Sequence, residues 1–324
     1  MKTKFLKKVC VVGCGKWGKN HLSTLDVLGS LGGVVESDLD RLEVIKKKYS
    51  KIKFFNNLDD AIEFGFDGYV VATPAPTHFK IAKKIIQSKN HLLVEKPITT
   101  KLEDAIKLNK LAKKNNVNLM VGHILLFHPA FNKIKEIIKS NKIGKLQYIY
   151  SNRLNLGTIR TEENVLWSFA PHDFALLKYL IDDNPIEISC NGNDVLQPNV
   201  HDTTLTHLKY KNNIMAHIFV SWLHPYKEHR FVVIGSEGMV HFEDSIEDKP
   251  LMFYNKKIEW EGNYPKINKS MGKIIDYKKS SPLKNELVYF IKHLDGKKIS
   301  ICNGENAIDC MRSITLAAEN LLEN

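Results

Sequence analysis

Short β-branched runs alternate with amphipathic segments over the first 120 residues of the chain. Between the runs, apolar residues recur at helical spacing, as in Ile81, Ala82, Ile85 and Ile86. The runs predict six strands, at residues 9–13, 34–38, 53–55, 68–72, 91–94 and 118–121. Strands that alternate with helices are typical of an α/β fold with a doubly wound parallel sheet, which is predicted here for a first domain of residues 1–121.

The pattern changes in the rest of the chain, which we predict to be a second α/β domain of residues 122–324. Helical patterns occupy residues 129–140, 172–180, 283–293 and 305–322, and a strand is expected at 146–153. Residues 214–222 alternate with the period of two that is typical of a sheet packed on one face. Strands at 231–234 and 239–242 flank a hairpin-like turn, and the polar stretch 255–281 predicts a mobile loop.

Composition narrows the class of protein. The 324 residues are 43% hydrophobic and 26% charged, and no apolar run approaches the ~20 residues that span a bilayer. The lysine-rich start is followed by an apolar segment too short for a signal peptide, so we expect a cytoplasmic protein without membrane association. The five cysteines are an odd, scattered set without zinc-ligand spacing, which predicts neither a disulfide framework nor a metal site.

The formal charge of +11 comes mainly from lysines in the polar phases of predicted helices, as in Lys46, Lys47 and Lys48. Such lysines usually form a solvated helix face, and no basic stripe interleaved with aromatic residues accompanies them. We therefore expect no nucleic-acid partner.

A glycine-rich motif links the first strand to the first helix. Gly13, Gly15 and Gly18 form G-x-G-x-x-G, with Lys16 and Trp17 inside it. The glycines permit a tight turn, close approach of a pyrophosphate, and close packing of helix on strand. Three glycines in an ordinary loop are the alternative, but the preceding strand and following helix favour a dinucleotide site.

The cofactor is expected to be NAD. Asp38 ends the second predicted strand twenty residues after Gly18, and a carboxylate there binds the ribose hydroxyls and repels a 2′-phosphate. Arg41 is a weak argument for NADP. Thr73 and Pro74 end the fourth strand, at the edge of the sheet where the cofactor is expected.

The fifth strand ends in Glu95, Lys96 and Pro97, which places a lysine at the same edge. Alone, this triplet could be a surface ion pair before a turn. Together with the glycine turn, Asp38, Thr73, Pro74 and His78, it resembles the Gfo/Idh/MocA family of sugar and inositol dehydrogenases. The resemblance implies a Rossmann domain, followed by an α/β domain whose open, mostly antiparallel sheet binds substrate and often mediates oligomerisation, and it implies a catalytic Lys96.

The family also carries a histidine at a helix start, often within Asp-x-x-x-His. His172 matches this histidine, whereas Ser168 replaces the aspartate and Asp173 follows the histidine directly. The family's Asp-Lys-His mechanism therefore does not transfer intact. The helix start could also be a structural cap through Asp173, but we predict that His172 is catalytic.

The segment leading to His172 is predicted to bind substrate. Its arginines suit an anion such as a diphosphate, its asparagines suit hydroxyl or acetamido groups, and its tryptophan can stack on a sugar or base. The expected substrate-binding residues are Arg153, Asn155, Gly157, Arg160, Asn164, Trp167 and Asp173. An interface or a loop held by internal ion pairs to Glu162 and Glu163 is the alternative.

This arrangement resembles nucleotide-sugar dehydrogenases, particularly the UDP-N-acetylglucosamine 3-dehydrogenase group. The resemblance implies NAD-dependent oxidation of the sugar 3-hydroxyl to a 3-keto sugar, used by a partner aminotransferase in routes to bacterial surface glycolipids such as lipid A. His172 would take the hydroxyl proton while Lys96 stabilises the oxygen, or Lys96 would itself be the base. UDP-N-acetylglucosaminuronic acid, inositol or a free sugar remain alternative substrates, and an NAD-sensing regulator is the non-enzymatic alternative. A homodimer or homotetramer is expected.

Overall fold

The computed structural model describes residues 7–267 and 270–323, and the chain divides into two compact units. Unit 1 is Met1–Phe127 with Ser281–Ile308, and unit 2 is His128–Ser280 with Asp309–Asn324. The sequence predicted one crossing, after residue 121; the structure adds a return of residues 281–308 to unit 1. This return has a packing cause, because α9 (Pro282–Lys292) buries Leu287 and Phe290 completely in unit 1 and contacts α1 (Gly18–Val27).

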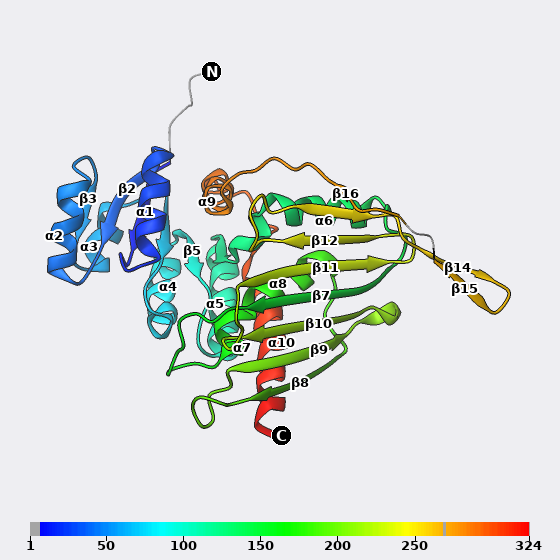
Figure 1. Cartoon of the computed structure of the whole chain (residues 1–324). Coiled ribbons are helices and arrows are strands. Elements are labelled where there is room, and N and C mark those ends of the chain that lie inside the picture. The colour runs from blue at the N-terminus through cyan, green and yellow to red at the C-terminus, as the bar shows by residue number, and fades with distance from the viewer. Residues whose placement is uncertain (1–6, 268–269, 324) are drawn as a thin grey trace, which may run out of the picture. The chain divides into compact units, whose positions relative to one another are not determined.

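Unit 1 contains the predicted doubly wound parallel sheet, with helices around it (Figure 1). Its strand order is β3-β2-β1-β4-β5-β6, and every pairing is parallel. The strands are β1 (Val9–Val12), β2 (Leu31–Val35), β3 (Lys53–Phe55), β4 (Gly68–Val71), β5 (His91–Glu95) and β6 (Leu119–Gly122). The order reverses between β1 and β4, and in doubly wound sheets a ligand binds at the carboxyl ends of the strands beside such a reversal.

Helices follow the strands of unit 1, and the apolar spacing at residues 81–86 predicted one of them. They are α1, α2 (Leu39–Lys48), α3 (Leu58–Phe64), η1 (Ala75–Thr77), α4 (His78–Gln87), α5 (Leu102–Asn115), η2 (Ile124–Phe127) and α9. The predicted limits of β2, residues 34–38, were wrong. The strand begins three residues earlier, because Leu31 and Gly33 pair with Val9 and Cys10 of β1, and it ends at Val35, before Asp38 caps α2.

Unit 2 is built on an eight-stranded sheet of order β16-β13-β12-β11-β7-β10-β9-β8. Only the β7–β10 pairing is parallel, so the sheet is mostly antiparallel. Its strands are β7 (Leu146–Leu154), β8 (Glu187–Asn193), β9 (Thr203–Lys209), β10 (Met215–Ser221), β11 (Glu228–Gly235), β12 (Met239–Glu243), β13 (Leu251–Tyr254) and β16 (Lys273–Ile274). The predicted hairpin turn joins β11 to β12, where Gly235 N donates to Gly238 O at 2.9 Å.

Helices cover one face of this sheet (Figure 1). Unit 2 contains α6 (Pro129–Lys139), α7 (Val165–Phe169), α8 (Pro171–Ile181), η3 (Lys211–Asn213) and most of α10 (Gly304–Glu323). The prediction of one mobile loop at residues 255–281 was wrong for much of that stretch. β14 (Ile258–Glu261) and β15 (Tyr264–Ile267) form a hairpin and β16 joins the large sheet, while residues 268–269 lie outside the described residues.

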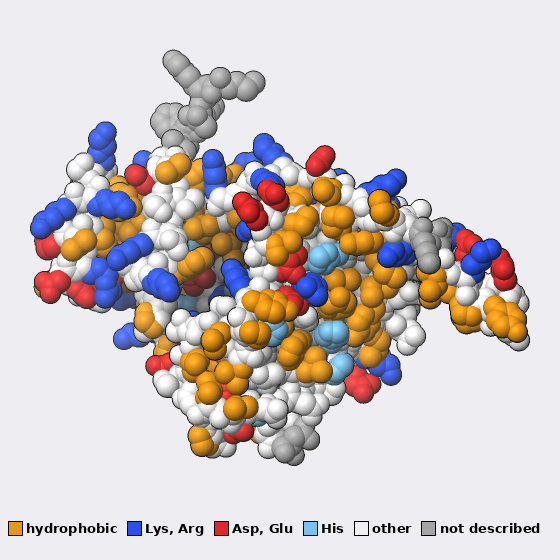
Figure 2. Space-filling model, viewed as in Figure 1, with side chains coloured by type: hydrophobic (Ala, Val, Ile, Leu, Met, Phe, Trp, Pro, Cys, Tyr) orange, Lys and Arg blue, Asp and Glu red, His pale blue; other side chains and the backbone are white. Residues whose placement is uncertain are grey.

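Among the described residues, no helix covers the opposite face of the large sheet (Figure 1). Along β10, Ala216, Ile218 and Val220 are fully buried, while the alternating Met215, His217 and Phe219 are partly exposed. Apolar and histidine side chains gather over this face in Figure 2. Over the described residues, the structure has no helix with the length and apolar character needed to cross a bilayer.

Candidate functional site

The glycine-rich turn after β1 has the geometry of a phosphate cradle. Gly13 adopts a positive φ of 89°, and a Cβ on Gly18 would lie 2.1 Å from Gly13 O, so the turn and α1 pack too closely for any side chain. A Cβ on Gly15 would meet nothing within 4 Å. The backbone beside Gly15 is thus open to a ligand at the start of α1, and the turn fits the pyrophosphate of a dinucleotide. Lys16 and Trp17 are exposed within this turn.

Two carboxylates follow β2. Asp38 Oδ1 accepts from Arg41 N at 2.9 Å and caps α2, and its Oδ2 pairs with Arg41 at 3.0 Å. Glu36, which the sequence analysis did not single out, is the first residue after the strand. Its Oε2 accepts from Cys14 N at 2.8 Å and from Arg41 at 3.1 Å. Glu36 therefore joins the strand end to the glycine turn, a role that its place directly after an apolar run could have indicated.

His78 connects two segments that the sequence assigned to the cofactor edge. Its side chain is buried, and its ring nitrogens lie 2.8 Å from Thr73 O and 2.8 Å from Pro97 O. Thr77 adds a hydrogen bond to Thr73 Oγ1 at 2.7 Å. The ring of His78 is thereby engaged with the backbone, so its contribution is to hold the end of β4 next to the segment after β5.

Glu95, at the end of β5, contacts several residues at the carboxyl edge of the unit 1 sheet. Its Oε1 accepts from Trp17 Nε1 and lies 2.7 Å from His21 Nε2, and its Oε2 accepts from Lys96 N at 3.2 Å. On the neighbouring strand, a Cβ on Gly122 would lie 2.9 Å from Glu95 Oε2. The triplet predicted from sequence is thus joined to the glycine turn by direct side-chain contacts.

Buried ionisable groups surround Glu95. The pKa of His123, directly after β6, is lowered to about 4 by burial and by Lys96, with Glu95 opposing. Burial and then the charge of Glu95 raise the pKa of Glu286, on α9, well above its usual range. The sequence analysis missed both residues, because their types and spacing carry no motif and only the fold brings them beside Glu95.

In unit 2, His172 is the second residue of α8 and is partly exposed, with Ser168 buried one turn earlier. The next residue, Asp173, is fully buried. It accepts from Ser151 at 2.7 Å and from Arg153 Nε and Nη2 at 2.9 and 2.8 Å. The expected substrate contact of Asp173 is therefore corrected: its carboxylate is an internal counter-ion that ties α8 to β7. The same pair occupies two of the donors on Arg153.

The other residues predicted to bind substrate lie between β7 and α8. Asn164 Oδ1 caps α7 by accepting from Trp167 N at 3.2 Å. Arg160 pairs with Glu163 at 3.0 Å while half of its side chain remains exposed, so the internal ion pair considered from sequence is present. Asn155 and Trp167 are partly exposed and Gly157 is exposed. This segment presents amide, guanidinium and indole groups near the start of α8 in sequence.

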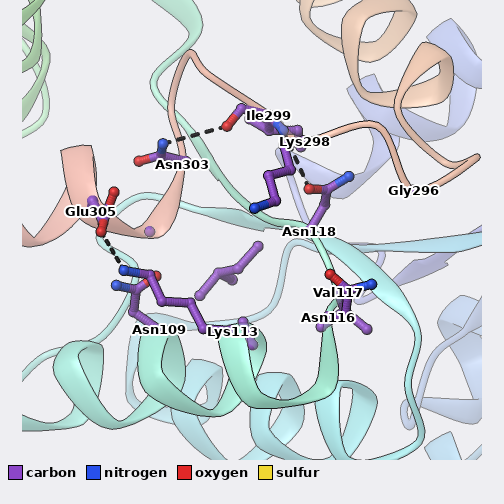
Figure 3. Close-up of a pocket in the computed structure, with 13 residues that line it drawn as sticks. Asn109, Lys113, Asn116, Val117, Asn118, Gly296, Lys298, Ile299, Asn303 and Glu305 are labelled. Carbon is purple, nitrogen blue, oxygen red and sulfur yellow. Dashed lines mark hydrogen bonds and ion pairs between the residues drawn. The ribbon is translucent and has the colours of Figure 1, made fainter.

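A pocket of about 470 Å³ lies elsewhere in unit 1, beside the start of β6 (Figure 3). Asn118 donates there to His293 O at 2.9 Å and Lys297 O at 2.7 Å, and Lys113 pairs with Glu305. Because β6 starts at Leu119, this is the amino edge of the sheet, opposite the glycine turn. Its polar groups hold the segment before α10 in place, so the pocket is separate from the candidate site.

The glycine cradle, the acidic strand end and the lysine at the sheet edge define a dinucleotide-dependent oxidoreductase. Comparison with known proteins agrees. Residues 7–123 match the family model for the Gfo/Idh/MocA oxidoreductases with an NAD-binding Rossmann fold, and residues 131–241 match the C-terminal domain model of the same family. The chain belongs to the Gfo/Idh/MocA family, and its cofactor is NAD.

Individual relatives are distant. Over 264 residues, covering 77% of this chain and 79% of the relative, the chain is 23% identical to a myo-inositol 2-dehydrogenase of Thermotoga maritima. It is 29% identical over 112 residues, 35% of each chain, to a UDP-N-acetylglucosamine 3-dehydrogenase of Acidithiobacillus ferrooxidans. The solved structure of that enzyme, GnnA, superposes with a TM-score of 0.86 over 98% of both chains at 20% identity. That structural likeness concerns the fold.

Proposed function

We propose that this protein oxidises the 3-hydroxyl of UDP-N-acetylglucosamine to a 3-keto sugar, with Lys96 and His172 as its catalytic residues. The observation that carries the proposal is the placement of Lys96. It follows β5 at the carboxyl edge of the Rossmann sheet, and its backbone is bonded through Glu95 to the glycine turn that fits the cofactor. A lysine held at that edge is suited to contact an alcohol that reacts beside a nicotinamide.

The residues divide the chemistry as follows. Gly15, the start of α1, and Glu36 with Asp38 would hold the pyrophosphate and ribose of the dinucleotide. When bound, NAD supplies the hydride acceptor. The His172 imidazole takes the proton of the substrate hydroxyl, and the Lys96 ammonium donates a hydrogen bond to the same oxygen as its negative charge develops. The alternative with Lys96 as the base uses the same two contacts.

Recognition of a nucleotide sugar is assigned to the segment before α8. Arg160 is half exposed and pairs only through its exposed fork with Glu163, so a diphosphate can replace that carboxylate. Asn155 and Trp167 supply an amide and an indole for the sugar or base. Arg153 and Asp173 contribute indirectly, because their ion pair anchors α8 at the residue next to His172.

An inositol is the second candidate substrate. Two donors of Arg153 are occupied by Asp173, which leaves Arg160 as the half-exposed arginine of the segment. A single exposed guanidinium is a modest site for a diphosphate, and an uncharged polyol needs none. The longer match to the Thermotoga maritima myo-inositol 2-dehydrogenase supports the same alternative.

The test is a substrate panel. The purified protein is incubated with NAD and UDP-N-acetylglucosamine, UDP-N-acetylglucosaminuronic acid, myo-inositol or scyllo-inositol, and NADH is followed at 340 nm. We expect turnover with UDP-N-acetylglucosamine and a product two mass units lighter, which a partner aminotransferase converts to a 3-amino sugar. Turnover of an inositol and of no other compound would show that the substrate is a cyclitol and not a nucleotide sugar. NAD binding without turnover of any compound would favour the non-enzymatic alternative, an NAD-sensing regulator.

We also propose that the uncovered face of the large sheet pairs with a second copy of the chain. The accessible side chains on this face are largely apolar or aromatic, with His207 and His217 among them; the others include Tyr148, Tyr150, Leu205, Phe219, Val232, Ile234 and Met239. Lys209 and Arg230 lie on the same face, toward its ends. An extended apolar face suits a contact between two identical copies related by a two-fold axis. Light scattering should give a dimer or tetramer for the protein and a monomer for Phe219→Glu, with Glu259→Lys on the exposed hairpin as the control.

A further inference from the structure

The carboxyl edge of unit 1 contains a buried polar cluster, made of His21, Glu95, His123 and Glu286, that the proposed chemistry does not use. His21 and Glu286 are fully buried and His123 is 5% exposed. The four residues come from α1, β5, the end of β6 and α9, so no local sequence pattern unites them. Three buried ionisable groups beside Glu95, whose own side chain is 13% exposed, are costly unless the four hold one another in a defined state.

Glu95 is the member with a complete set of contacts. One carboxylate oxygen is shared by Trp17 of the glycine turn and His21 of α1, and the other accepts the backbone N–H of Lys96. The indole of Trp17 and the ring of His21 meet edge to face, with centroids 6.3 Å apart. A single carboxylate thus restrains the turn that fits the cofactor and the backbone of the lysine that would contact the substrate.

The neighbouring strand makes room for this carboxylate. A Cβ at Gly122 would approach Glu95 Oε2 to 2.9 Å and Cδ to 3.1 Å, closer than unstrained contacts allow. Gly122 has neither a turn to form nor a positive φ, since it is the last residue of β6. Its lack of a side chain is explained by the position of Glu95.

Glu286, the member of the cluster on α9, is fully buried. Neither of its carboxyl oxygens has a hydrogen-bond partner among the described residues, and the same holds for Nδ1 of His21 and of His123. Burial and then the charge of Glu95 raise the pKa of Glu286.

We propose that Glu95 is a positioning residue that couples the glycine turn to Lys96, and that Glu286, buried on the helix α9 that packs against α1, supports it. Cofactor binding at the turn and orientation of Lys96 then depend on the same side chain. The part of this inference that concerns Lys96 rests on the proposed function, whereas the part that concerns the turn does not.

The experiment compares Glu95→Ala, Glu95→Gln and the exposed control Glu43→Ala, which loses only a pair with Lys46 on α2. NAD affinity is measured by calorimetry without any sugar. We expect Glu95→Ala to weaken NAD binding by about 10- to 100-fold, the usual cost of losing a buried residue that orients a site, and Glu95→Gln to recover part of it because an amide oxygen still accepts from Trp17 or His21. Glu43→Ala should bind normally.

A second measurement isolates Glu286. Glu286→Gln keeps the shape of the side chain without adding a charge and should bind NAD as the unaltered protein does. Glu286→Lys should weaken binding as Glu95→Ala does, because it adds a cation that competes with Trp17 and His21 for the Glu95 carboxylate. Circular dichroism is used to check that each variant is folded.

Unchanged NAD affinity in folded Glu95→Ala would overturn the coupling. Normal NAD affinity in folded Glu286→Lys would show that Glu286 has no part in the coupling. Glu95→Ala could lose NAD affinity while the unaltered protein turns over none of the sugars. That result would support the coupling of the turn and refute the proposed substrate, so the two failures are distinguishable. Where a substrate is found, Glu95→Gln should lower kcat with a smaller change in its KM, because substrate does not contact Glu95.

Discussion

Arg153 on β7 and Asp173 on α8 form a two-pronged ion pair inside unit 2. Arg153 Nε lies 2.9 Å from Asp173 Oδ2 and Nη2 lies 2.8 Å from Oδ1, and Ser151 donates to the same carboxylate at 2.7 Å. The arginine side chain is 12% exposed and the aspartate is completely buried. His172 immediately precedes this aspartate, so the pair determines how the start of α8 is held against the sheet.

Asp173→Ala should therefore destabilise unit 2 and reduce activity together. Removing one partner leaves the Arg153 charge buried without its counter-ion, a change that costs about 3–5 kcal/mol. Urea unfolding monitored by circular dichroism measures the loss. Arg160→Ala is the matched control, because its ion pair with Glu163 is half exposed and should contribute less than about 1 kcal/mol. Equal free energies of unfolding for the two variants would show that the buried ion pair stabilises unit 2 no more than the exposed one does.

Lys96→Ala and His172→Ala should each lower turnover without unfolding the protein. Loss of a group that transfers a proton reduces the rate by about 10²–10⁴-fold. Stopped-flow absorbance at 340 nm with saturating NAD and substrate measures the hydride step directly. NAD affinity of His172→Ala should stay normal, because unit 1 alone carries the glycine turn. Near-normal hydride transfer in both variants would refute the catalytic assignment.

Two glycines of the turn should respond differently to alanine. In Gly18→Ala the new Cβ would meet Gly13 O at 2.1 Å, so the turn must move and stability should fall by about 1–3 kcal/mol. In Gly15→Ala the Cβ enters open space, so the melting temperature should be kept while NAD affinity falls by about tenfold or more as the methyl occupies the pyrophosphate site. Melting curves and calorimetry on the two variants separate these effects.

The buried carboxyl of Glu286 predicts a pH-dependent difference from Glu286→Gln. Because the pKa of Glu286 is raised in the folded state, its stability contribution is full below the unfolded value near 4.5 and is lost as pH rises toward the folded pKa. Over that window the unaltered protein loses up to about 1.4 kcal/mol per pH unit from this group, and the glutamine variant does not. The free energy of unfolding of Glu286→Gln, relative to the unaltered protein, should therefore increase with pH above 4.5. A constant difference from pH 4.5 to 7.5 would mean that Glu286 ionises normally.

The sequence by itself determined the architecture and the cofactor edge. Short β-branched runs between helical patterns predicted all six strands of the parallel sheet, although the limits of β2 were wrong, and the strand before and helix after Gly13, Gly15 and Gly18 located the cradle. These features are local, since a glycine turn or an amphipathic helix is specified by residues a few positions apart. The same locality explains why the start of β2 was predicted wrongly: Leu31 and Gly33 belong to the strand because they pair with β1, and this pairing joins residues that are distant in sequence.

Only the tertiary structure decided which polar residues belong together. In the folded chain Asp173 pairs with Arg153, and Glu36 accepts from the backbone N–H of Cys14. The helix α9 packs in unit 1, where the charge of Glu95 acts on Glu286. The physical reason is that ion pairing, desolvation and close packing depend on distances in space, and residues separated by up to 191 positions acquire them only when the chain has folded. A motif indicates where chemistry can occur, and the packing around it decides which side chains remain available.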